Sequence, residues 1–89
     1  MTEKIYWCPR EEDARALMGE LHNLGYRWNS GDKLTANSNW NSYREETCYF
    51  IDKDKAVTYS CRDYCYSRDY EFEEYSTRLT IAQLLRKRL

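Results

Sequence analysis

The clearest hydrophobic pattern in the chain runs over residues 10–24. Apolar side chains recur there at helical spacing and form one stripe, which consists of Ala14, Leu17, Met18, Leu21 and Leu24. Pro9 lies just before it, where a missing N–H costs a helix nothing, and Gly25 lies where a C-cap is expected. The pattern predicts an amphipathic helix over residues 10–24, with acidic residues 11–13 at the positive end of its dipole.

Shorter apolar and β-branched stretches predict strands on both sides of this helix. The segment 61–69 leaves two interpretations open, a short helix or a loop, and residues 52–55 (DKDK) suit a hairpin turn. The predicted strands cover residues 3–8, 47–52, 56–60 and 70–75. We expect Leu17, Met18 and Leu21 to pack against a sheet that includes Tyr49 and Ile51.

The C-terminal residues carry a second helical pattern. Thr80 and Gln83 have the spacing of a capping box, and Ile81, Leu84, Leu85 and Leu89 form an apolar stripe. The order of elements therefore predicts a single α+β domain over residues 1–89. Its expected architecture is a small antiparallel sheet packed against one main helix, with a short C-terminal helix.

The segment after the first helix holds two of the three tryptophans. Tyr26 and Trp28 share one face of a strand, so we expect Trp28 to be mainly structural. Trp40 lies in the long polar segment 29–46, and long loops are often functional. An aromatic side chain there is either an anchor for a ligand or partner, or a lid over the sheet. We expect Trp40 to be mainly functional.

Composition narrows the classes of partner. Charged residues make up 33% of the chain and the formal net charge is −1, which favours neither a nucleic acid mimic nor a non-specific duplex binder. Nucleic acid is therefore an unlikely partner. Residues 1–8 have no apolar stretch typical of a secretion signal, and no segment approaches the length of a membrane span. We expect a cytoplasmic protein without a membrane partner.

The four cysteines offer little chemistry. We expect Cys8, Cys48, Cys61 and Cys65 to be reduced thiols, because no secretion signal supports disulfides. Only Cys61 and Cys65 are closely spaced, and a structural zinc site usually shows two close pairs. The sole histidine, His22, lies on the predicted helix, and no catalytic pattern includes it. We therefore expect no metal, no cofactor and no enzymatic activity.

Aromatic residues interleaved with arginine are the remaining signal. Stacking of a base on an aromatic ring contributes ~1–3 kcal/mol, and arginine adds bidentate contacts to phosphate. The candidate ligand-binding residues are Arg27, Trp40, Tyr43, Arg44, Arg62, Tyr64 and Arg68. A small core also needs large aromatic side chains. The residues expected in the core are Tyr26, Trp28, Tyr49, Phe50 and Tyr59.

Three stretches, "LHNLGYRWNSG", "NWNSYREETCYFI" and "AVTYS", resemble a loose group of small bacteriophage proteins that share a Gly-Tyr-x-Trp-x-Ser-Gly turn. The resemblance covers about residues 4–75. It implies a protein that acts in the cytoplasm of a bacterial host against its defences, by sequestering a nucleotide-type immune signal. The alternative is an interaction protein that inhibits a host defence protein, such as a CRISPR effector, by direct docking.

These two functions predict different surfaces. Sequestration calls for a concave pocket with convergent arginine and aromatic groups, whereas docking calls for a flat patch with exposed Trp40 or Tyr43. A nucleic-acid binder would need a continuous basic stripe. Residues 78–89 are basic and follow four acidic residues within 69–74. The terminal helix then either folds back on its own sheet or packs on a second copy, which would form a homodimer.

Overall fold

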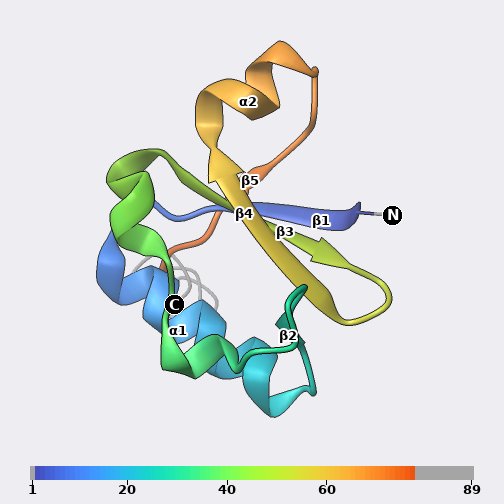
Figure 1. Cartoon of the computed structure of the whole chain (residues 1–89). Coiled ribbons are helices and arrows are strands. Elements are labelled where there is room, and N and C mark those ends of the chain that lie inside the picture. The colour runs from blue at the N-terminus through green and yellow to red at the C-terminus, as the bar shows by residue number, and fades with distance from the viewer. Residues whose placement is uncertain (1, 78–89) are drawn as a thin grey trace, which may run out of the picture.

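The computed structural model describes residues 2–77 and shows an α+β fold (Figure 1). One sheet has the strand order β2-β4-β3-β1-β5. Helix α1 (Glu11–Asn23) packs on one face of this sheet, and the short helix α2 (Arg62–Ser67) follows β4. The strands are β1 (Thr2–Trp7), β2 (Arg27–Trp28), β3 (Thr47–Asp52), β4 (Ala56–Cys61) and β5 (Glu73–Glu74).

The sheet is mixed, and in this respect the expectation of an antiparallel sheet is wrong. The three long strands β1, β3 and β4 pair antiparallel, but β2 runs parallel to β4 and β5 runs parallel to β1. Helix α1 connects β1 to β2 and brings the chain back to the end of the sheet at which β1 begins. Strand β2 therefore runs in the direction of β1, which is also the direction of β4.

The main helix agrees with its sequence pattern. It begins at Glu11, after Arg10 in an extended conformation, and it ends at Asn23. Gly25 has φ +94°, a conformation that favours glycine, so the expected C-cap position is confirmed. Leu24 is the exception to the predicted stripe, because 61% of its surface stays exposed at the C-terminal end of the helix.

The core lies between α1 and the sheet, as expected. Leu17, Met18 and Leu21 are buried in one cluster with Tyr49 and Ile51. Trp28 also belongs to this cluster, and Val57 and Leu34 are fully buried there. Tyr26 and Tyr59 pack against it while partly exposed, and Phe50 lies in a second cluster on the opposite face.

The other predicted elements differ in extent. Residues 3–8, 47–52 and 56–60 correspond to β1, β3 and β4, and the turn after Asp52 closes with a 3.0 Å bond from Lys55 N to Asp52 O. The predicted strand 70–75 shrinks to β5, and the ambiguous segment 61–69 holds α2. The predicted helix 80–89, with its proposed dimer contact, lies outside the described residues. Among residues 2–77, none of the helices has the length and apolar character needed to span a bilayer.

The long segment 29–46 is held against the protein by short 3₁₀ turns, at Leu34–Ala36, Trp40–Ser42 and Arg44–Glu46. Leu34 is fully buried in the core. The Tyr49 hydroxyl donates a 2.7 Å hydrogen bond to the Ser38 carbonyl, which fixes the middle of the segment over β3. This polar segment is thus attached to the rest of the protein at two points, the Leu34 side chain and the Ser38 carbonyl.

Candidate functional site

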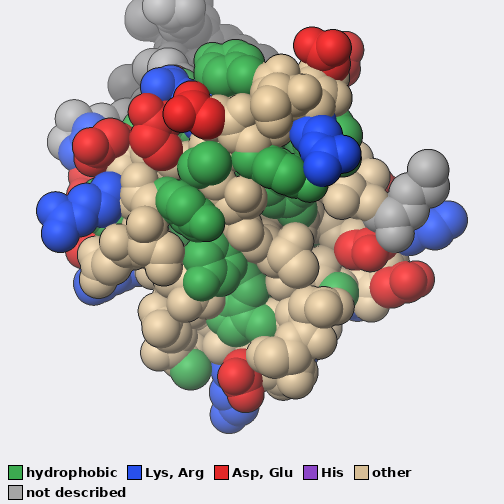
Figure 2. Space-filling model, turned by 45° about the horizontal axis from the view of Figure 1, so that its top comes forward, with side chains coloured by type: hydrophobic (Ala, Val, Ile, Leu, Met, Phe, Trp, Pro, Cys, Tyr) green, Lys and Arg blue, Asp and Glu red, His purple; other side chains and the backbone are tan. Residues whose placement is uncertain are grey.

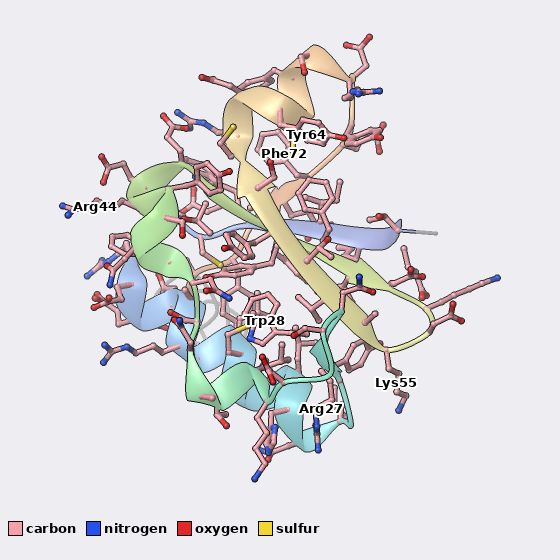
Figure 3. The ribbon with its side chains drawn as sticks, in the orientation of Figure 1. Arg27, Trp28, Arg44, Lys55, Tyr64 and Phe72 are labelled. Atoms are coloured by element: carbon pink, nitrogen blue, oxygen red, sulfur yellow. The ribbon has the colours of Figure 1, made fainter. Side chains whose placement is uncertain are left out.

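The predicted ligand-binding residues do not gather around one point: Figure 3 shows Arg27, Arg44 and Tyr64 in three separate parts of the molecule. Arg27 lies next to His22, with 3.3 Å between Nη1 and Nδ1, and donates to the Tyr26 carbonyl at 2.8 Å. Arg44 has φ 52° and its side chain points away from the body of the protein. Tyr64 and Arg68 lie together on and just after α2, where the guanidinium is 5.3 Å from the ring centroid. The arginines therefore do not form a common phosphate site.

Arg62 links elements of the fold. Its guanidinium stacks on the Trp7 ring at 4.4 Å and also forms an ion pair with Glu46 at 2.9 Å. It thus joins the start of α2 to β1 and to the end of the 29–46 segment. Trp7, which the sequence analysis did not single out, donates its indole N–H to the Glu45 carbonyl at 2.7 Å. The sequence did hold a signal for this position: Trp7 follows Ile5 by two residues in the first predicted strand, so both side chains lie on the same face.

Trp40 is half-buried and packs against the main core. Its indole N–H donates a 2.9 Å hydrogen bond to the Cys8 carbonyl, and its own carbonyl accepts a 3.2 Å bond from the Thr47 hydroxyl. Of the two alternatives for this side chain, the structure supports the lid over the sheet. The apolar surroundings missing from its own segment come from the core, so Trp40 contributes to the fold, and its functional role stays a prediction.

A first hollow, here called the loop-side hollow, lies between β4 and the segment after β2. Its volume is about 580 Å³. Its aromatic wall holds Trp28 and Tyr59, whose ring centroids are 5.6 Å apart, and Tyr43 packs on Tyr59 at 6.0 Å. The Trp28 indole N–H is used internally, since it donates to the Asn37 carbonyl at 3.0 Å. The other lining residues are Asn29, Ser30, Asp32, Lys33, Ala36, Asn37, Asn39, Val57 and Thr58.

A second hollow, the helix-side hollow, opens on the opposite face of β4 and has a volume of about 370 Å³. Three rings form its aromatic part: Phe50 lies 6.1 Å from Tyr64 and 6.3 Å from Tyr70, and the two tyrosines are 6.1 Å apart. Thr2, Thr58, Tyr59 and Ser60 complete the lining. The two hollows therefore share Thr58 and Tyr59 and lie on either side of one strand.

A third and larger hollow, of about 970 Å³, lies beside β1 and the segment 69–73. Its lining includes the acidic residues Glu3, Asp69, Glu71 and Glu73. Lys4 lies there too, but it forms an ion pair with Glu73. This excess of carboxylates disfavours an anionic ligand.

Four tyrosines remain strongly exposed. The exposed fractions are 41% for Tyr43, 38% for Tyr64, 61% for Tyr66 and 43% for Tyr70. Figure 2 shows hydrophobic side chains running as a band across one face of the molecule, with charged side chains mostly along its margins. Exposed apolar patches of this kind occur at sites of interaction on many proteins.

The thiols are poorly placed for chemistry. Cys8, Cys48 and Cys65 are buried and Cys61 is half-buried. Burial raises the pKa of Cys8 to about 12, and burial likewise raises the pKa of Cys48 and of Cys65. These three groups are therefore protonated at neutral pH and are weak nucleophiles and weak metal ligands. Within residues 2–77, no three or more metal-ligating side chains are grouped so that they could hold an ion.

Comparison with known proteins identifies no relative: no family matches the chain, and no curated protein or solved structure shows significant similarity to it.

Proposed function

We propose that this protein is a non-enzymatic binding protein that docks on a partner protein through the aromatic surface around β4. The observation that carries the proposal is the exposure of Tyr43, Tyr64, Tyr66 and Tyr70 on a protein that buries its other large aromatic side chains wholly or in part. Tyrosine is enriched at protein interfaces because it combines a large apolar area with a polar tip and few rotatable bonds.

The arrangement of these rings suits a docking surface. Tyr64 and Tyr70 pack edge-on against each other and against Phe50, so their orientations are fixed before a partner binds. Preorganised side chains lose less conformational entropy on binding, which favours affinity. The guanidinium of Arg68 over Tyr64 adds a charged group at the border of the patch. Aromatic and arginine side chains together are the usual residues of binding hot spots.

The resemblance of the Gly-Tyr-x-Trp-x-Ser-Gly turn to bacteriophage proteins makes a bacterial defence protein the first partner to test. A tagged form of the chain should retain such a protein from a bacterial lysate, and the retained protein should then be purified. Its affinity should be compared for the wild type, for the double variant Tyr64→Ala/Tyr70→Ala and for Leu24→Ala. Leu24 is a matched control because it is also apolar and exposed, but lies at the end of α1.

We expect the double tyrosine variant to bind at least about 30-fold more weakly, as hot-spot truncations commonly do, and Leu24→Ala to bind like the wild type. The melting temperature of each variant confirms that it is folded. Equal affinity of the wild type and the folded double variant for the purified partner would contradict docking through this surface.

The second candidate function is sequestration of a nucleotide-type ligand. The loop-side hollow favours it, because its volume of about 580 Å³ fits a small ligand and it combines aromatic rings with amide groups and Lys33. Mass spectrometry of small molecules released from protein purified from cells with active nucleotide signalling tests this function. We expect such a ligand to be lost from Lys33→Ala, and a ligand-free wild type would remove the candidate.

A further inference from the structure

We infer that the outer edge of β4 beyond Val57 binds an extended segment of a partner protein by strand addition. The inference rests on the proposed docking function and specifies its mode. It starts from the position of β4 in the sheet: β2 is its outer neighbour, but it pairs only at Arg27–Ala56 and Trp28–Val57. From Thr58 to Cys61, β4 pairs with β3 on its inner side but has no strand on its outer side among residues 2–77 (Figure 1).

The chain leaves this edge abruptly after β2. Asn29 N donates to Val57 O at 3.0 Å, which is the last backbone hydrogen bond of this segment to β4. Gly31, with φ +96°, then allows a tight turn in which its N–H bonds to Trp28 O at 2.7 Å. The turn carries the chain away and leaves the second half of β4 uncovered on this side.

Backbone alternation determines which groups point outward. Because Val57 O faces Asn29, the backbone groups two and four residues later face the same way. The other edge agrees: Thr47, the β3 neighbour of Cys61, uses its carbonyl to accept from Cys8 N at 2.9 Å, on the far side of β3. The N–H and C=O of Tyr59 and the N–H of Cys61 therefore point toward the open edge.

This edge lacks the usual protection against strand pairing. Natural edges are blunted by charged residues, prolines or covering segments. Residues Thr58 to Cys61 include no charged residue and no proline. Thr58 is exposed and the next three residues are partly exposed. A partner strand can thus reach the three outward backbone groups.

The two hollows explain how such a strand would be recognised. Successive side chains of an extended segment point to opposite faces of a sheet. A strand paired with Tyr59 would direct one side chain toward the loop-side hollow and the next toward the helix-side hollow, since Thr58 and Tyr59 line both. The aromatic lining of the helix-side hollow by Phe50, Tyr64 and Tyr70 selects a large apolar side chain.

A second copy of β4 fits this site poorly. Paired across a two-fold axis at Tyr59, it would offer only Thr58 and Ser60 to the helix-side hollow, because these residues share that face of the strand. Two small polar side chains would leave an aromatic hollow of about 370 Å³ largely unfilled. The occupant is therefore an extended segment of a different protein, with a large apolar residue adjacent to the residue that enters the loop-side hollow.

Proline substitution tests the backbone contribution directly. Cys61→Pro removes one outward N–H without taking a hydrogen bond from the pairing of β3 with β4, and the φ of −94° at Cys61 lies near the range of proline. Cys61→Ala is the reference, because it removes the same thiol and keeps the N–H. Lys53→Pro, in the exposed turn before β4, controls for proline itself. Linear random heptapeptides displayed on a carrier and selected on the wild-type protein serve as the probe.

We expect the selected peptides to carry a large apolar residue and to bind Cys61→Pro about tenfold more weakly than Cys61→Ala, with Lys53→Pro like the wild type. Should Cys61→Pro not fold, an amide-to-ester replacement at Tyr59, introduced by ligation at Cys61 or Cys48, removes the other outward N–H and should weaken binding similarly. Sedimentation should show a monomer that the edge variants leave unchanged.

Three results would overturn strand addition. They are equal affinity of the selected peptides for the folded Cys61 variants, failure of the selection to enrich any peptide, and a wild-type dimer that Cys61→Pro dissociates. None of them affects docking through the tyrosines, which is tested separately by Tyr64→Ala/Tyr70→Ala on the purified partner. Conversely, a purified partner that binds the wild type and Tyr64→Ala/Tyr70→Ala equally well would contradict docking through the tyrosines, even if the selected peptides still bind the edge of β4.

Discussion

The two faces of the sheet both carry apolar and aromatic side chains, but they differ in how completely other elements cover them. On the α1 face, side chains such as Tyr49, Ile51 and Val57 are covered by the 13 residues of the helix and by the segment 29–46. On the opposite face, Ile5, Cys48 and Phe50 form a buried cluster with Cys65 of α2, and Phe72 packs against this cluster. The tyrosines of that second layer stay exposed.

The length of the covering helix accounts for the difference. A helix of 13 residues is about 20 Å long, whereas the six residues of α2 span about 9 Å. The short helix therefore covers only one end of its face, and tyrosines complete the layer. The α1 face is therefore covered, while the opposite face keeps exposed aromatic side chains, which are the surface of the proposed docking.

The largest effect is expected from opening the α1 face. Leu17 is only 2% exposed and lies in the main core, so Leu17→Ala should lower the free energy of unfolding by about 2–5 kcal/mol. Leu24→Ala, on the same helix but 61% exposed, should change it by less than about 0.5 kcal/mol. Urea denaturation of both variants measures the contrast, and similar losses would show that α1 does not pack as described.

An intermediate effect is expected at the lid. Trp40→Ala removes partly buried area and the hydrogen bond to the Cys8 carbonyl, so it should cost about 1–3 kcal/mol of stability. Trp40→Phe keeps most of the ring and loses the indole N–H, and should cost about 0.5–1.5 kcal/mol. Thermal unfolding compares the two. An unchanged melting temperature in Trp40→Ala would contradict the role of this side chain as a lid and favour a mainly functional role.

The smallest effect is expected on the second face. Tyr66 is 61% exposed and its main aromatic contact is Phe72, at 5.4 Å between ring centroids. Tyr66→Ala should therefore change the free energy of unfolding by less than about 1 kcal/mol. The same urea titration serves as the measurement. A loss as large as that of Leu17→Ala would mean that the two faces contribute equally to stability.

Much of the fold followed from local patterns. The helical stripe, the glycine after it and the three long strands were all readable, because periodicity and capping depend on neighbours within a few residues. The candidate site was less accessible. Tyr43 and Tyr64 were selected for the site. Tyr59 was expected in the core and Tyr70 was not among the candidate ligand-binding residues, although both line hollows. Nothing local distinguishes a ring that packs from a ring that lines a surface.

What the sequence determined by itself was the main helix, the three long strands and the main apolar face. What the tertiary structure decided was how distant residues meet. Asp13 was expected only to favour the helix dipole, yet it is buried and its Oδ1 accepts bonds from the Thr77 hydroxyl at 2.8 Å and the Thr77 N–H at 3.2 Å. Trp40 likewise finds its partner at Cys8, and the open edge of β4 exists because β2 ends at Trp28. Each depends on contacts between residues far apart in the chain, and only the folded backbone brings such residues within hydrogen-bonding distance.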